Sequence, residues 1–155
     1  MDKLKIKDLC MPCTETLKVK DSEGIQTAIE RFTALPDVHA LFVVDGQGHL
    51  KGMVKIRHLL NWVRVKLGVH QERRKITISE AFEVVKMSRS MKIKDILSPS
   101  VSVKLEDTLE HALNVMANEE LVELAVVDEK NKLIGEIKLT NLMSKLLKQA
   151  EKEKK

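Results

Sequence analysis

The spacing of apolar side chains predicts two amphipathic helices at equivalent places along the chain. Residues 25–32 and 109–116 each carry apolar side chains at positions i, i+3, i+4 and i+7, which fall on one face of a helix. Asp107 precedes the second stripe, and Glu110 lies three residues after Asp107, which is the spacing of a capping box. We therefore expect a helix in each segment, the second one capped by Asp107.

Short apolar runs rich in β-branched residues predict buried strands on either side of these helices. One long run in each half ends at an aspartate, and a turn sequence then leads into a further apolar run, which indicates a hairpin. The expected strands are Leu17–Val19, Leu41–Asp45 and Leu50–Ile56, followed by Val101–Leu105, Leu124–Asp128 and Leu133–Leu139.

The order strand–helix–strand–strand–helix occurs twice because the chain repeats itself. KIKD at residues 5–8 recurs at residues 92–95, and Gly52 corresponds to Gly135. One such unit has a small sheet with helices on a single face, so it cannot bury both faces of the sheet alone. We predict an α/β (α+β) fold in which two β-α-β-β-α repeats pack sheet against sheet with pseudo-two-fold symmetry.

These patterns also divide the chain into segments. A helical stripe in the segment between the repeats stops at Gly68, and Thr77 with Glu80 has capping-box spacing, so we expect that segment to be ordered. The expected organisation is repeat 1 at residues 1–61, a helical spacer at 62–90, repeat 2 at 91–147 and a charged tail at 148–155.

Composition narrows the classes of function. The 155 residues are 43% hydrophobic and 32% charged with a net charge of +4, which is typical of a soluble globular protein. The sequence has no apolar run long enough to cross a bilayer and starts without a signal-peptide core, so we expect a cytoplasmic protein with no membrane partner. With 3% aromatic residues, recognition of nucleic acid by base stacking is disfavoured.

Neither a metal site nor a catalytic centre is expected. Cys10 and Cys13 have zinc-ligand spacing, but a structural zinc site needs about four ligands and the sequence has no second CxxC. The sequence also lacks a P-loop, a nucleophile elbow, an HExxH motif and a paired-carboxylate motif. We therefore expect two unpaired thiols and no enzymatic activity.

The doubled, ordered set of motifs resembles a tandem pair of cystathionine-β-synthase-type (CBS) domains, also called a Bateman module. The second repeat is the closer match and runs MKIKDILSPSVSVKLEDTLEHALNVMANEELVELAVVDEKNKLIGEIKLTNLM. The first resembles it, with an expanded segment at residues 10–16. The resemblance implies a regulatory module that binds adenosine-containing ligands between its repeats and often forms flat homodimers.

In such modules a G-h-h-[ST]-x-x-D element holds the ligand: its hydroxyl meets phosphate, and its aspartate accepts hydrogen bonds from the ribose. Here Lys55 and Lys138 stand at the hydroxyl position, and His58 and Asn141 stand at the aspartate position. Loss of the carboxylate removes a charge-assisted acceptor that contributes about 1.5–3 kcal/mol, whereas each lysine adds a charge suited to phosphate. Exposed surface lysines and an ordinary Asn helix cap are the structural alternatives.

The resemblance adds further candidates by position. The hydroxyl residues before the first strand of each repeat, and the residues that open each VVD strand, where the family holds adenine, are expected to line the clefts. These candidates are Thr14, Thr16, Ser100, Ser102, His39, Ala40, Leu41, Val122, Glu123 and Leu124.

The leading hypothesis is a sensor of an adenosine ligand (AMP, ADP, ATP or S-adenosylmethionine) that signals to an unidentified partner protein, requires no cofactor and forms a homodimer. One alternative is a ligand-free dimerisation or protein-interaction module with a degenerate nucleotide site. The other, less favoured, is a nucleic-acid binder that uses the basic residues of the spacer, for which we expect steep salt dependence.

Overall fold

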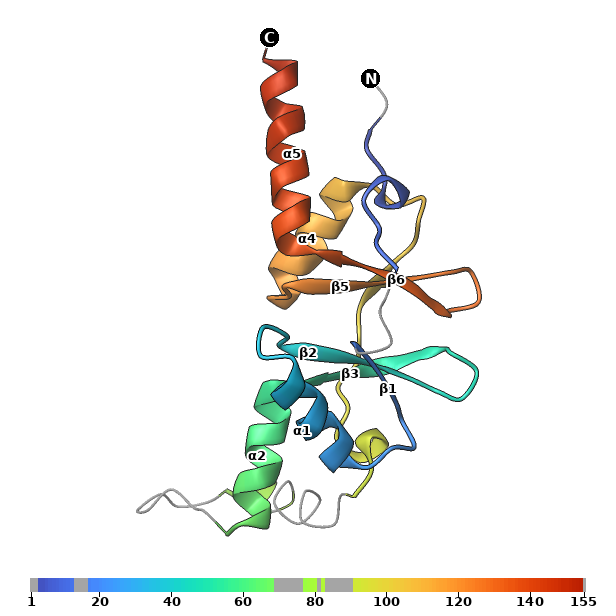
Figure 1. Cartoon of the computed structure of the whole chain (residues 1–155). Helices are drawn as coiled ribbons and strands as arrows, with labels where there is room; N and C mark the ends of the chain where they lie inside the picture. Colours follow the sequence, from blue (N-terminus) through green and yellow to red (C-terminus); the bar gives the residue numbers. More distant parts are fainter. Residues whose placement is uncertain (1–2, 13–16, 69–76, 81, 83–90, 155) are drawn as a thin grey trace.

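Two three-stranded sheets face each other, and two helices cover the outer side of each sheet (Figure 1). The computed structural model describes residues 3–12, 17–68, 77–80, 82 and 91–154. Repeat 1 contains β1 (Lys18–Lys20), α1 (Ile25–Ala34), β2 (Ala40–Val44), β3 (Leu50–Lys55) and α2 (Ile56–Lys66). Repeat 2 contains β4 (Ser102–Val103), α4 (Leu109–Glu119), β5 (Glu123–Val127), β6 (Leu133–Lys138) and α5 (Leu139–Glu153).

Both sheets have the same topology, which confirms the predicted repeat. In each sheet the first strand pairs in parallel with the second, and the second pairs antiparallel with the third. The two hairpin turns share one geometry because Oδ1 of Asp45 and of Asp128 each accepts hydrogen bonds from two backbone N–H groups of its own turn at 2.8–2.9 Å. These bonds also lower the pKa of both aspartates.

The two sheets pack face to face through a shared core, as the sequence predicts. Phe42 and Met53 of the first sheet belong to one hydrophobic cluster with Ala125 and Val127 of the second. The hairpin ends are also joined, because Leu50 N–H donates to the Asn131 carbonyl at 2.9 Å. The interface between the facing sheets is called the seam below.

Each KIKD segment packs against the opposite repeat, which the sequence did not predict. The 3-10 turn Ile6–Asp8 lies on repeat 2, where Ile6 N–H donates to the Asp107 carbonyl at 2.8 Å. The 3-10 turn Ile93–Asp95 lies on repeat 1, where Ile93 N–H donates to the Glu23 carbonyl at 2.9 Å. Both isoleucines are 0% exposed, so each repeat has its core completed by a segment of chain that leads into the other.

The helix ends bear out some of the expected signals and correct two. Asn141 is not a helix cap, because it lies within α5 (Leu139–Glu153), whose cap residue is Lys138. The expectation that Asp107 caps α4 is wrong, because Thr108 is the cap residue: its Oγ1 accepts from His111 N–H at 3.1 Å. Asp107 instead closes the preceding turn by accepting from Lys104 N–H at 2.8 Å. After α2 the chain turns at Gly68, which has φ +66°, as its place in the sequence predicts.

In the part of the expected spacer that the structure describes, a helix begins after Thr77. Glu80 N–H donates to Thr77 Oγ1 at 3.2 Å, which confirms Thr77 as a cap. Residues 69–76, 81 and 83–90 of the spacer lie outside the described residues, as do the candidates Thr14 and Thr16 and the second thiol, Cys13. Within the described ranges, no helix combines the length and the apolar character needed to cross a membrane.

Candidate functional site

The junction of β3 and α2 carries two of the candidate ligand residues of repeat 1. Lys55 ends the strand, and its backbone N–H donates to His58 Nδ1 at 3.3 Å. Burial first, and then the charges of Lys55 and Arg57, lower the pKa of His58. The ring is therefore neutral at pH 7 with its proton on Nε2, so Nε2 of His58 is a hydrogen-bond donor.

The chain that leads from Ile93 into β4 is called the crossing segment of repeat 2, and it lies beside β3 next to this junction. The chain from Ile6 to Met11 is the crossing segment of repeat 1. Ser98 and Met53 exchange backbone hydrogen bonds at 2.9 and 3.0 Å, and Ser98 Oγ donates to the same Met53 carbonyl at 3.2 Å. Gly52 makes this approach feasible, because a Cβ there would collide with the Ser98 carbonyl and lie 2.7 Å from Leu97 Cδ1. Ser98, which the sequence analysis did not single out, thus lies directly beside the element that carries Lys55.

The β6–α5 junction of repeat 2 repeats this arrangement with residues of the N-terminal segment. Met11 and Glu136 exchange backbone hydrogen bonds at 3.0 and 2.9 Å. Asn141 Nδ2 lies 3.6 Å from Met11 Sδ, so the side chain at the aspartate position touches the crossing segment. Lys138 precedes α5 and is exposed. Each junction is therefore shared between the two repeats.

The remaining described candidates lie in four environments. His39 and Val122 are exposed just before β2 and β5, and Glu123, the first residue of β5, is half-buried. Leu41 and Leu124 are fully buried, and Leu41 packs among the side chains beneath α1 and α2. Ala40 is buried in the seam core. Ser100 and Ser102 are half-buried where the chain passes from repeat 1 to β4.

Two glutamates in repeat 2 form a feature of which the sequence analysis found only one member. Glu136 is 2% exposed, and Oε2 of both Glu136 and Glu123 is buried without a hydrogen-bond partner among the described residues. Burial raises the pKa of both carboxyl groups; the charge of Glu136 raises that of Glu123 further, and Lys138 opposes both shifts. The available signal was Glu136 at the position where repeat 1 carries Met53.

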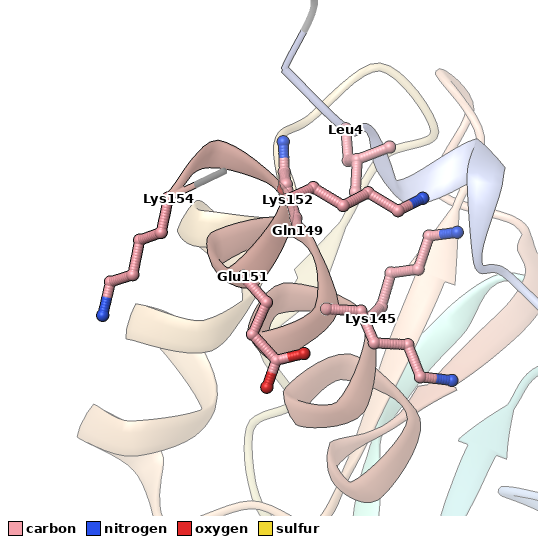
Figure 2. Close-up of a pocket in the computed structure, with 7 residues that line it drawn as sticks. Leu4, Lys145, Gln149, Glu151, Lys152 and Lys154 are labelled. Carbon is pink, nitrogen blue, oxygen red and sulfur yellow. The ribbon is translucent and has the colours of Figure 1, made fainter.

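A groove of about 700 Å³ lies away from the seam, between Leu4 and the last turns of α5 (Figure 2). Four of its seven lining side chains are the lysines Lys145, Lys148, Lys152 and Lys154. None of the candidate residues lines this groove. The described part of the chain also holds no group of three or more His, Cys, Asp and Glu side chains arranged to bind a metal ion.

Comparison with solved structures shows the same fold. CBSX2 from Arabidopsis thaliana, in complex with AMP, is 22% identical with a TM-score of 0.72, over 95% of this chain and 98% of that one. A CBS domain-containing protein from Thermotoga maritima is 23% identical with a TM-score of 0.69, over 96% and 97%. The cytosolic domain of the Mg²⁺ channel MgtE, in complex with ATP, is 21% identical with a TM-score of 0.64, over 92% and 49%.

Comparison at the level of sequence finds the same family in both halves of the chain. Curated protein sequences give no significant match. The family model described as CBS domain matches twice, at residues 6–65 and at residues 93–148, and these spans follow the two structural repeats. The chain therefore belongs to the CBS domain family, as a tandem pair of CBS domains.

Proposed function

We propose that this CBS pair is a regulatory module that binds an adenine nucleotide in the clefts along its seam and signals to a partner protein. The main observation behind this proposal is that the crossing segment of the other repeat pairs with the strand that leads into each strand–helix junction. A ligand in either cleft touches both repeats and stabilises the arrangement of repeats that it fits best. The complexes of CBSX2 with AMP and of the MgtE domain with ATP support this ligand class.

In this proposal, different side chains at the junctions bind different parts of the ligand. Lys55 supplies a point charge for phosphate, and His58 Nε2–H donates to a ribose or phosphate oxygen. Lys138 and Asn141 take the corresponding places in repeat 2. In this proposal the half-buried Ser100 and Ser102 complete the clefts, and the exposed His39 and Val122 border the base.

The direct test is calorimetry and thermal unfolding with AMP, ADP, ATP and S-adenosylmethionine. A ligand at one hundred times its Kd stabilises the folded state by about 2.7 kcal/mol, which raises Tm by roughly 5–10 °C. Lys55→Ala should weaken ATP binding about tenfold, since a charge-assisted contact contributes about 1.5–3 kcal/mol. Lys51→Ala is the matched control, because Lys51 is exposed on the same strand. If none of the four ligands binds folded protein, the proposal fails.

A gain-of-binding variant tests the aspartate position independently. His58→Asp supplies the carboxylate acceptor that the family uses for the ribose hydroxyls, so AMP should bind about tenfold more tightly. Asn141→Asp makes the same change at the other junction and reports which cleft takes AMP. Unchanged AMP affinity in both variants would show that neither side chain faces the ribose.

Dimerisation is a second candidate function, because α2 and α5 each leave a large apolar side chain exposed. Leu60 on α2 is 59% exposed and Leu147 on α5 is 66% exposed. Sedimentation velocity should show a homodimer that Leu60→Glu together with Leu147→Glu converts to monomer. A wild-type monomer at high micromolar concentration would exclude this function.

A further inference from the structure

The two repeats line the seam with different chemistry at equivalent positions. In repeat 1, Ala40 pairs with Lys55, and Met53 lies opposite Phe42. In repeat 2, Glu123 pairs with Lys138, and Glu136 lies opposite Ala125. Directly opposed residues share one face of an antiparallel pair, so Glu123 and Glu136 replace the alanine and the methionine on the seam face. Apart from the equivalent lysines Lys55 and Lys138, these positions are apolar in repeat 1 and carry two carboxyl groups in repeat 2.

These carboxyl groups lack the partners that buried acids normally have. Glu136 is almost completely buried, and Oε2 of each glutamate accepts no hydrogen bond from the described residues. A buried carboxyl without a partner destabilises a fold, and native proteins keep few of them. The pair is therefore poorly explained as a structural feature, since Met53 fills the equivalent place without this cost.

The surroundings of the pair are short of positive charge. Lys138 interacts with both carboxyl groups and His39 with Glu123, so one lysine serves two acids, and the crossing segment places the Cys10 thiol against the neighbouring Gly135. Burial raises the pKa of Cys10, and although a backbone hydrogen bond from Glu136 opposes this shift, the net direction is upward, so the thiol is uncharged at neutral pH. Glu123 is half-buried and connects the pair to the open end of β5, beside Lys138.

We propose that Glu123 and Glu136 make the repeat-2 cleft a receptor for an adenosine ligand with a positively charged substituent. This inference rests on the proposed function and divides it between the clefts. A cationic group supplies the charge that the two carboxylates lack, whereas the phosphates of a nucleotide would be repelled by them. Anionic nucleotides bind instead at the repeat-1 junction, because Lys55 is paired there with Ala40, whereas Lys138 is paired with Glu123.

The experiment compares two ligands that differ only in the methyl group and the positive charge on one sulfur atom. S-adenosylmethionine carries a sulfonium charge, and S-adenosylhomocysteine lacks the methyl group and that charge. Calorimetry should show S-adenosylmethionine binding wild-type protein at least about tenfold more tightly, because a hydrogen bond or contact between charged groups contributes about 1.5–3 kcal/mol. AMP, measured in parallel, reports on the other cleft.

Variants then assign the preference to the two acids. Glu123→Gln combined with Glu136→Gln should reduce affinity for S-adenosylmethionine about tenfold or more and leave AMP binding within about twofold. Glu119→Gln is the control, since Glu119 is an exposed acid at the end of α4. Lys55→Ala should give the reverse pattern, with AMP weakened and S-adenosylmethionine unchanged. The Tm of each variant verifies folding, and Glu123→Gln alone serves if the double variant does not fold.

The outcomes separate this inference from the proposed function. Equal affinity for the two sulfur ligands, or tight binding of S-adenosylmethionine by the double variant, overturns the inference. If AMP binds and S-adenosylmethionine does not, the inference falls while the proposed function stands. If no adenosine ligand binds, both fall. Binding of Mg²⁺ alone that depends on Glu136 would also overturn it, because the pair would then be a metal site.

Discussion

Replacement of Gly135 by alanine tests the crossing of the N-terminal segment onto repeat 2. A Cβ at this position would collide with Cys10 Sγ and lie 2.6 Å from the Met11 carbonyl oxygen. The thiol can rotate away, but the backbone carbonyl is held by its hydrogen bond from Glu136 N–H at 2.9 Å. The crossing segment must therefore shift away from β6.

The expected loss of stability follows from these contacts. Two backbone hydrogen bonds join Met11 and Glu136, and each contributes about 1 kcal/mol when formed. Overpacking by one methyl group in a closely packed site destabilises by about 1–3 kcal/mol. With partial relaxation of the segment, we expect Gly135→Ala to lower the free energy of unfolding by about 2–4 kcal/mol and Tm by roughly 5–15 °C.

Urea unfolding followed by circular dichroism measures this loss, and two other glycines frame it. Gly52→Ala meets Ser98 in the same way in repeat 1 and should have a similar effect. Gly46→Ala is the control, because no atom lies within 4 Å of a Cβ there, and it should stay within about 0.5 kcal/mol of wild type. If Gly135→Ala is as stable as Gly46→Ala, the crossing segment does not lie against β6.

Three further predictions probe other parts of the fold. Thr108→Ala removes the cap of α4 and should destabilise by about 1 kcal/mol in urea unfolding; no change would mean that another residue caps this helix. Ile93→Ala should cost about 2–5 kcal/mol, because the cavity opens in the core of repeat 1, and a loss below 1 kcal/mol would contradict the crossing. Glu136→Met, which copies repeat 1, should be more stable than wild type at pH 7. Burial raises the pKa of Glu136 above its ordinary value of 4.5, so wild type loses stability as pH rises from about 4.5 through the raised pKa. The advantage of the variant should therefore be smaller below that window. An advantage independent of pH would refute that account.

The sequence alone determined the elements and the repeat because both depend on local patterns. The apolar stripe at residues 25–32 becomes α1, and the strands lie within a residue or two of their expected ends, since periodicity directly reflects which side of an element is buried. The sequence did not locate the cap of α4: Asp107 and Thr108 are both good cap residues, and the actual start of the helix at Leu109 selects the threonine. The family match to both halves confirms the predicted tandem pair.

Only the tertiary structure decided which repeat each KIKD segment completes. The two segments are nearly identical, so Ile6 and Ile93 suit either core, and the local sequence contains no information that distinguishes them. The crossing brings Ser98 to β3 and Met11 to β6, and it surrounds Glu136 with buried groups. These neighbours are far apart along the chain and meet because each small sheet needs the other repeat to cover it, which is a property of the packed pair and not of any one segment.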